Sequence, residues 1–226
     1  IQLELVVTLN QSFSLLKLKK GILVLAQARR YSLLTAQIQL RLILDLQSGR
    51  IKPEEFGLIA DGVETISDSW ILQVNNLVQT NGQLLANCSD LEDYVNQTLF
   101  EKNIKIYEDT NTTDPADIYN IVDSFQAISL WTQSVLGLGP LQEQGLFAEA
   151  ITEFSYISTN SLNDLLINLA DSLTVLLDSV NNQRNHINNV VNSFLAAILS
   201  WLGCVILFFS AFLRSLYNKE KKNMFA

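Results

Sequence analysis

The stretch FLAAILSWLGCVILFFSAFL, from Phe194 to Leu213, decides how this sequence is organised. Its twenty residues carry no charge, and as a helix they would span roughly 30 Å, the thickness of the hydrocarbon core of a bilayer. The core helix of a water-soluble protein rarely stays apolar on every face for that length. The stretch therefore predicts one transmembrane helix, which we place at residues 192–214.

The charges on either side of this stretch predict its orientation. Arg184 is the nearest full charge before it, and four basic residues follow it: Arg214, Lys219, Lys221 and Lys222. Basic residues gather on the cytoplasmic side of a membrane span. We therefore expect residues 215–226 to be a basic cytoplasmic tail. The bulk of the chain should lie on the extracytoplasmic side of the plasma membrane or of another secretory-pathway membrane.

The sequence that leads into the predicted span repeats its apolar residues at alternating spacings of four and three. The series contains one polar member, Gln183, and runs through Leu162, Leu166, Leu169, Leu173, Leu176, Val180, Gln183, Ile187, Val190 and Phe194. This heptad pattern predicts a helix that continues from about residue 160 to 218. A rod of this kind couples an outer domain mechanically to the membrane.

Long helices are also predicted for the rest of the chain. The 226 residues include only 9 glycines and 3 prolines, whereas sheet-rich folds need many turns. We expect helices at about 2–47, from Pro53 to about 86, from Asp114–Pro115 to about Leu136, and at about 142–156, with stops at Gly49 and at Leu136–Pro140. The predicted fold class is all-α: an up-and-down four-helix bundle of residues 1–191 that continues into a single C-terminal transmembrane helix.

Residues 87–114 are predicted to be an irregular excursion on the surface of this bundle. A capping box at Ser89–Glu92 predicts the start of a short helix, and residues 103–107 alternate as a strand does. Three of four N-glycosylation sequons fall in or beside this excursion; the acceptors are Asn10, Asn87, Asn96 and Asn111. Their use would place the excursion in the secretory lumen or outside the cell.

The distribution of charge excludes one class of partner. Residues 51–185 carry a net charge of -16, against +5 for the first fifty residues and -8 for the whole chain. Nucleic-acid binding depends on clustered Lys and Arg, so we expect no nucleic-acid partner. Cys88 and Cys204 should not pair, because Cys204 lies within the predicted span.

The candidate ligand-binding residues are Arg29, Arg30 and Tyr31, in the middle of the first predicted helix. Guanidinium groups suit planar oxyanions, so the three could form a clamp for a carboxylate or another anion. The alternative interpretation is a pair of ordinary surface arginines that face the acidic body of the protein. The sequence by itself leaves both open.

No pattern in the sequence indicates catalysis. The motifs of serine hydrolases, phosphate-binding loops, dinucleotide-binding folds and zinc proteases do not occur. The acidic residues around Asp90 and Glu108 lack the spacing of a calcium loop. We therefore predict a protein that is not an enzyme, with no cofactor and with no catalytic or metal-binding residues.

A helical bundle whose last helix runs directly into a membrane span resembles the four-helix sensor ectodomains of chemoreceptors and related membrane receptors. The resemblance is architectural, and it implies a receptor-like or sensor-like ectodomain that belongs to a larger membrane protein, with a first span before Ile1. The alternative is a structural subunit that holds a membrane-associated assembly together and has no ligand of its own. The expected partners are the lipid bilayer and other membrane or extracellular subunits, including further copies of this chain.

Overall fold

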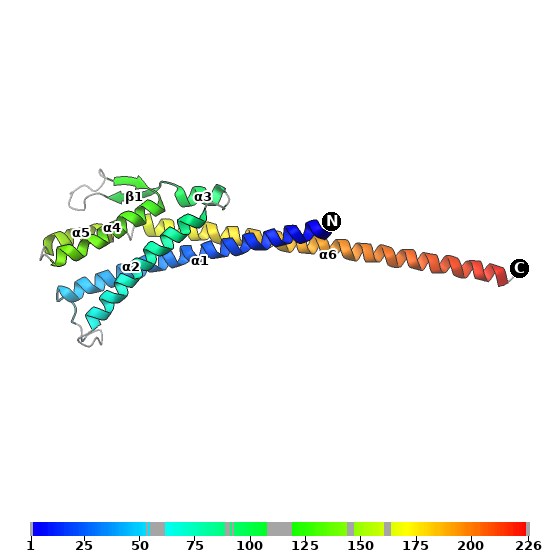
Figure 1. The fold of residues 1–226 in the computed structure, drawn as a ribbon, viewed down its shortest axis with the longest axis horizontal. Coiled ribbons are helices and arrows are strands. Elements are labelled where there is room, and N and C mark those ends of the chain that lie inside the picture. The colour runs from blue at the N-terminus through cyan, green and yellow to red at the C-terminus, as the bar shows by residue number, and fades with distance from the viewer. Residues whose placement is uncertain are drawn as a thin grey trace. The chain divides into compact units, whose positions relative to one another are not determined.

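The computed structural model describes residues 2–52, 54, 62–88, 91, 93–107, 119–143, 147–160 and 164–224. They form the elements labelled in Figure 1: α1 (Gln2–Gln47), α2 (Gly62–Asn87), α3 (Asp93–Phe100), β1 (Ile104–Tyr107), β2 (Tyr119–Val122), α4 (Ser124–Glu143), α5 (Phe147–Asn160) and α6 (Leu166–Met224). The all-α prediction is confirmed. The described residues form six helices, and the two short ones, α3 and α5, correspond to the short helix expected after Ser89–Glu92 and to the helix expected at about 142–156.

The described chain divides into two compact units. The larger unit is Lys17–Val180, and the smaller one combines Ile1–Leu16 with Asn181–Ala226. Two long helices, α1 and α6, contribute residues to both units. The domain boundaries predicted at 191 and 214 remain predictions.

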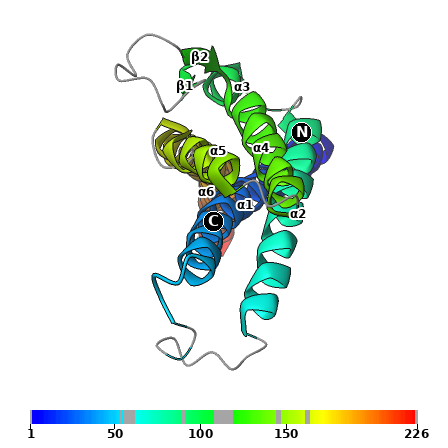
Figure 2. The ribbon, with the colours of Figure 1, turned by 90° about the vertical axis from the view of Figure 1, so that its left-hand side faces the viewer.

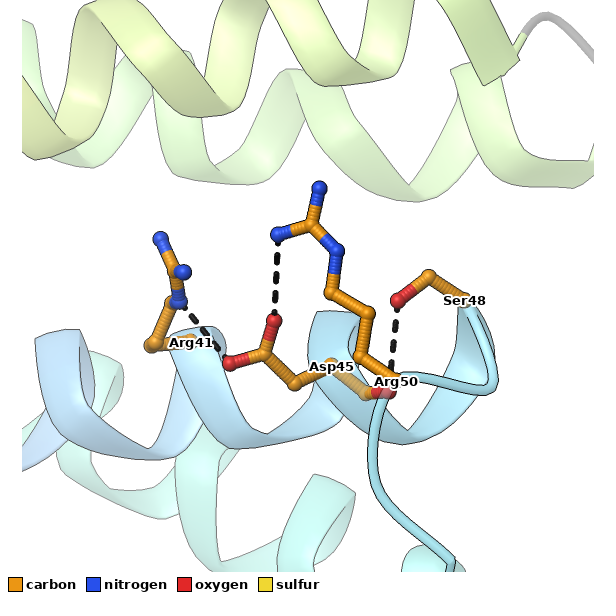
Figure 3. Close-up of polar contacts among 4 residues, drawn as sticks. All are labelled: Arg41, Asp45, Ser48 and Arg50. Carbon is orange, nitrogen blue, oxygen red and sulfur yellow. Dashed lines mark hydrogen bonds and ion pairs between the residues drawn. The ribbon is translucent and has the colours of Figure 1, made fainter.

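The end of α1 is where the sequence predicts it, at Gln47. Gly49 adopts a φ of 70°, a left-handed conformation that glycine enters at little cost. The Asp45 carboxylate pairs with Arg41 Nε at 2.9 Å and with Arg50 Nη1 at 3.5 Å, as Figure 3 shows. The Ser48 hydroxyl donates to the carbonyl oxygen of Asp45 at 3.2 Å. The Ser48 bond satisfies a carbonyl oxygen of the last helical turn, where carbonyls lack a partner within the helix. The pair with Arg50 joins the helix to the residues that follow it.

Two clusters of buried apolar residues form the core of the Lys17–Val180 unit. In one, Leu33 and Ala36 of α1 join Leu169 of α6 and the large ring of Trp131. The other joins Ile22 and Ala26 of α1 to Leu176 of α6 and to residues of α2 and α3, among them Leu84, Val95 and Leu99. Earlier residues of α1 thus pack with later residues of α6, so the two helices run antiparallel within this unit (Figure 1).

The heptad series of α6 is confirmed by burial. Its described members are all buried or half-buried up to Phe194, and the fully buried ones are Leu169, Leu176, Val180, Gln183 and Ile187; Leu162 lies outside the described residues. Gln183 belongs to the smaller unit, where its side-chain Nε2 donates to the backbone oxygen of Ser12 at 3.2 Å. The polar member of the series therefore joins α6 to α1.

The prediction for the helix after Asp114 is wrong at both ends. Asp114 and Pro115 lie outside the described residues, and residues 119–122 form strand β2 instead of helix. The helix, α4, begins at Ser124, because the Asp123 carboxylate accepts hydrogen bonds from two of its first free amides, those of Phe125 and Gln126, both at 2.9 Å.

The predicted stop at Leu136–Pro140 is also wrong, since α4 continues to Glu143. Leu138 is buried in the first cluster, so core packing holds this segment in the helix despite its glycines and proline.

Only some of the apolar residues of α2 face the core. Val74 and Leu77 are buried and Trp70 packs against the core, but Ile71 and Val78 are about half exposed. Pro53, the predicted start of the helix, lies outside the described residues, as do Ser89, Asp90 and Glu92 of the capping box. The helix expected after that box is α3.

The strand-like alternation at residues 103–107 corresponds to a real strand. Strand β1 pairs antiparallel with β2, with Ile104 opposite Val122 and Tyr107 opposite Tyr119. Figures 1 and 2 show this hairpin beside the helices of the larger unit. The side chain of Asn160 makes hydrogen bonds with the free edge of β1, as a third strand would. Its Oδ1 accepts a hydrogen bond from the Tyr107 amide at 2.8 Å, and its Nδ2 donates one to the Tyr107 backbone oxygen at 3.1 Å.

We predict that Asn160→Ala lowers the free energy of unfolding by about 1–3 kcal/mol, because it leaves a backbone donor and a backbone acceptor without partners. Thermal denaturation of the full chain measures the loss, and hydrogen exchange at the Tyr107 amide locates it. The control is Asn75→Ala on the exposed side of α2, for which we expect a change within about 0.5 kcal/mol. Equal effects of the two substitutions would contradict the role of Asn160.

Candidate functional site

The three predicted ligand-binding residues do not converge on one site. Arg29 is completely buried, with 0% of its surface exposed, whereas Arg30 is exposed and Tyr31 is 63% exposed. Successive residues of a helix point about 100° apart, so neighbours in the sequence face different surroundings. Arg29 faces the core and the other two face an external groove.

Arg29 joins three helices of the larger unit. Its Nη1 donates to Asn81 Oδ1 of α2 at 3.1 Å and to the Ser124 hydroxyl of α4 at 3.5 Å. Its guanidinium carbon lies 5.0 Å from the centre of the Phe125 ring, a cation–π contact. Arg29 falls between Ala26, in one apolar cluster, and Leu33, in the other. The charged side chain of Arg29 and its polar partners therefore lie between the two apolar clusters.

The partners of Arg29 are themselves held in place. The Asn81 Nδ2 donates to the backbone oxygen of Phe125 at 3.5 Å, and the Ser124 hydroxyl donates to the backbone oxygen of Leu99 at 3.2 Å. These bonds extend the network to α3. The Nε of Arg29 is buried and has no hydrogen-bond partner, so the network satisfies this guanidinium only in part.

Burial lowers the pKa of Arg29 to about 10, with Cys88 and Asp123 acting in the opposite direction. Arg29 is therefore still a cation at neutral pH. Because its pKa is lower in the folded than in the unfolded chain, the free energy of unfolding rises as the pH rises above about 10.

The pKa of Cys88 is shifted in the opposite direction from that of Arg29. Burial raises the pKa of its thiol from 9.0 to about 11, which the charge of Arg29 opposes. The thiol is therefore neutral at physiological pH. Its contribution to stability is complete below pH 9 and is lost as the pH rises to 11.

Arg30 and Tyr31 line an open groove of about 590 Å³ within the larger unit. The groove lies between α1 and α6, and most of its surface is apolar, from residues such as Leu23, Leu34, Leu173 and Leu177. No ion pair or hydrogen bond to another described residue engages the Arg30 side chain. The groove thus combines apolar walls with an available cation, which suits an amphipathic or anionic partner better than a cationic one.

The predicted glycosylation acceptors differ in accessibility. Asn10 and Asn87 are exposed. Asn96 is half-buried, and its Nδ2 donates to the backbone oxygen of Leu91 at 3.2 Å. Asn111 lies outside the described residues. Asn10 and Asn87 are therefore the best-placed acceptors among those described.

No residue of the long apolar segment of α6, Phe194–Leu213, is buried. Among the described residues, α6 is the one helix that is long and apolar enough to cross a membrane, and none of its most apolar stretch is buried by the rest of the protein. Within the same residues, no three His, Cys, Asp or Glu side chains come together as metal ligands would.

The fold and these sites define an all-helical protein of packed long helices with one candidate membrane-spanning helix. No family model, curated protein or solved structure matches the chain.

The periodicity of the sequence could have shown that Arg29 and Arg30 lie on different faces of α1. The buried residues of α1 follow one heptad series that includes Arg29: Lys19, Ile22, Ala26, Arg29, Leu33, Ala36, Leu40 and Ile43. Extending the apolar series Leu33–Ile43 backwards places Arg29 on the buried face and Arg30 off it.

We predict that Arg29→Ala destabilises the larger unit by about 3 kcal/mol or more, because it leaves a cavity and removes the bonding partner of Asn81. Arg30→Ala is the matched control, with an expected change within about 0.5 kcal/mol. Chemical denaturation of both variants, followed by circular dichroism, measures the difference. If Arg30→Ala were the more destabilising of the two, the structural role assigned to Arg29 would be wrong.

Proposed function

We propose that the protein is a membrane-anchored helical ectodomain of the receptor or sensor type, and that it is part of a larger membrane protein. One observation carries the proposal: α6 is a single uninterrupted helix from Leu166 to Met224. Its first turns lie in the core of the larger unit, and the same helix later carries the uncharged stretch Phe194–Leu213. A displacement of α6 in the core would thus act directly on the span.

Anchoring is supported by the exposure of this stretch. Trp201 is 67% exposed, and Leu207, Phe208 and Leu213 are similarly uncovered. So large a continuous apolar surface is unfavourable in water and marks contact with a membrane or a partner. We propose that residues 192–214 cross the bilayer once, with residues 215–226 in the cytoplasm, since Arg214 ends the span and Lys219 follows it.

The contact between α1 and α6 in the smaller unit supports transmission toward the membrane. Gln183 binds the Ser12 backbone in a series that is otherwise apolar. A polar residue at such a position fixes the register between two packed helices. In our proposal, an up-and-down bundle of residues 1–191, similar in architecture to chemoreceptor ectodomains, senses a signal outside the membrane, and α6 carries it inward.

A non-catalytic structural subunit is the second candidate. The exposed apolar residues of α2, such as Ile71, Leu72 and Leu85, favour it, because surfaces of this kind contact other proteins. A subunit of this type should stay bound to other chains after gentle extraction from its membrane, whereas a sensor ectodomain should separate from them.

We predict that tryptophan fluorescence of the full chain in vesicles is quenched by lipids brominated on their acyl chains, and that Trp201→Phe removes most of the quenching. Trp131 is buried in the core and serves as the internal reference. Quenching that persists unchanged in Trp201→Phe would place the apolar stretch outside the bilayer and overturn the proposed anchor.

We predict that the chain expressed in a eukaryotic secretory pathway loses mass on treatment with a glycosidase, and that Asn87→Gln reduces the loss by one glycan. Asn96→Gln is the matched comparison. It is expected to change the loss little because the Asn96 side chain is half-buried whereas that of Asn87 is exposed; both amides donate to a backbone oxygen. A chain without glycans, cleaved by protease within residues 87–113 only from the cytoplasmic side, would reverse the proposed topology.

A further inference from the structure

The groove between α1 and α6 places one charged side chain among apolar ones. Its described lining residues are Leu23, Gln27, Arg30, Tyr31, Leu34, Ala170, Leu173, Thr174 and Leu177, all within the larger unit. Arg30 is the one charged residue among them, and no described ion pair or hydrogen bond engages it. The groove volume of about 590 Å³ lies within the range of small-molecule sites, about 300–1,000 Å³. A small ligand with a negative charge therefore fits it in size and in sign.

The free hydrogen-bond donors of the groove come from α1. Gln27 and Arg30 are both exposed, and neither side chain has a described partner. Side chains three residues apart are neighbours on a helix, so an amide N–H and a guanidinium fork lie together. Across the groove, the Thr174 hydroxyl donates to the backbone oxygen of Ala170 at 3.3 Å. Donors paired in this way suit the two oxygens of one carboxylate.

The apolar part of the groove extends mainly to one side of Arg30. Because α1 and α6 are antiparallel, Leu23 and Leu177 lie toward one end, and Leu34 and Ala170 toward the other. Leu23 is seven residues from Arg30, about 10 Å along the helix, whereas Leu34 is four residues away, about 6 Å. An apolar chain of about 10 Å that starts at Arg30 would thus cover the longer side.

The acidic residues beside the groove limit the charge of its ligand. Asp171 and Asp178 are exposed on α6, and each directly follows a lining residue. A second negative charge on the ligand would lie against these carboxylates or against the leucines, and both contacts are unfavourable. The groove therefore favours a single carboxylate over a phosphate or another polyanion.

We propose that this groove binds a single-chain amphiphile with one carboxylate group, of the type of a medium-chain fatty acid. Arg30 and Gln27 hold the carboxylate, and the chain lies toward Leu23 and Leu177. Binding does not depend on the membrane span. The role of the ligand as the signal that the ectodomain senses rests on the proposed function.

Photolabelling of the full chain in lipid nanodiscs tests the site. The probe is octanoate with a diazirine at its last carbon, and mass spectrometry of the labelled peptides locates its chain. We expect labels near Leu23 of α1 and Leu177 of α6, and excess octanoate should remove them. Octan-1-amine, which has the same chain and the opposite charge, should compete about tenfold less well. Labelling confined to Phe194–Leu213 would show partition into the bilayer and overturn the proposal.

Substitution of the cation tests how the carboxylate is held. Arg30→Ala should reduce the groove labelling about tenfold, because it removes a charge-assisted hydrogen bond. Lys20→Ala is the control: Lys20 is exposed on the same helix but does not line the groove, and we expect a change within about twofold. Circular dichroism checks that both variants are folded. Equal losses in the two would assign the effect to the general charge of α1 and overturn the proposal.

The length of the competing carboxylate tests the apolar part. From butanoate to octanoate, each added methylene should improve competition about two- to fourfold, since it buries apolar surface. Competition that does not depend on chain length would overturn the assignment of the leucines to the ligand chain.

The site and the proposed function can fail separately. Groove labelling in a chain whose Trp201 is not quenched by brominated lipid would uphold the site and refute the anchor. Groove labelling without any effect of octanoate on the Trp201 quenching would uphold the site and refute its sensing role. Quenching of Trp201 without groove labelling would overturn the site and leave the anchor intact.

Discussion

The larger unit depends on one constraint: a single face of α1 must pack against several other elements along its length. The same heptad series supplies Ile22 and Ala26 to one apolar cluster and Leu33 and Ala36 to the other. Arg29 interrupts this apolar series but does not interrupt the packing. Its guanidinium donates hydrogen bonds to Asn81 and Ser124 and makes a cation–π contact with the Phe125 ring. A buried cation is costly unless it is bonded in this way. The Arg29 side chain therefore helps to fix the positions of α2 and α4 against α1.

Polar side chains serve a similar purpose elsewhere in the molecule. Asn160 satisfies the outer edge of β1, Asp123 caps α4, and Gln183 binds α1 through Ser12. Asn160 and Asp123 complete backbone hydrogen bonding that regular structure leaves open. Gln183 instead adds a bond to a carbonyl inside α1. These bonds are directional, so they select one arrangement among the many that apolar packing alone would permit.

Helix continuity connects this packing to the proposed function. The residues of α6 in the apolar clusters and the uncharged stretch Phe194–Leu213 belong to one helix without a break.

Local pattern in the sequence determined the helices with long periodic faces. The bounds of α1, the buried series of α6 and the strand-like alternation of β1 all follow from residue spacing, since a regular element repeats its environment at a fixed period. The same reasoning extends to Arg29, because its spacing from Leu33 puts it on the buried face. It also identified the uncharged stretch of α6, which depends on composition alone.

Only the tertiary structure decided the features that depend on distant residues. Strand β2 was predicted as helix because Ile121 and Val122 suit either structure, and its pairing with β1 made the choice. The helix α4 passes Pro140 because Leu138 is buried by other elements. The separation of Arg29 from Tyr31 into core and groove likewise depends on where α2, α4 and α6 pack around α1. The spacing of residues along the chain determines which residues share a face of a helix or strand. Which other elements pack on that face depends on residues that are distant in the sequence.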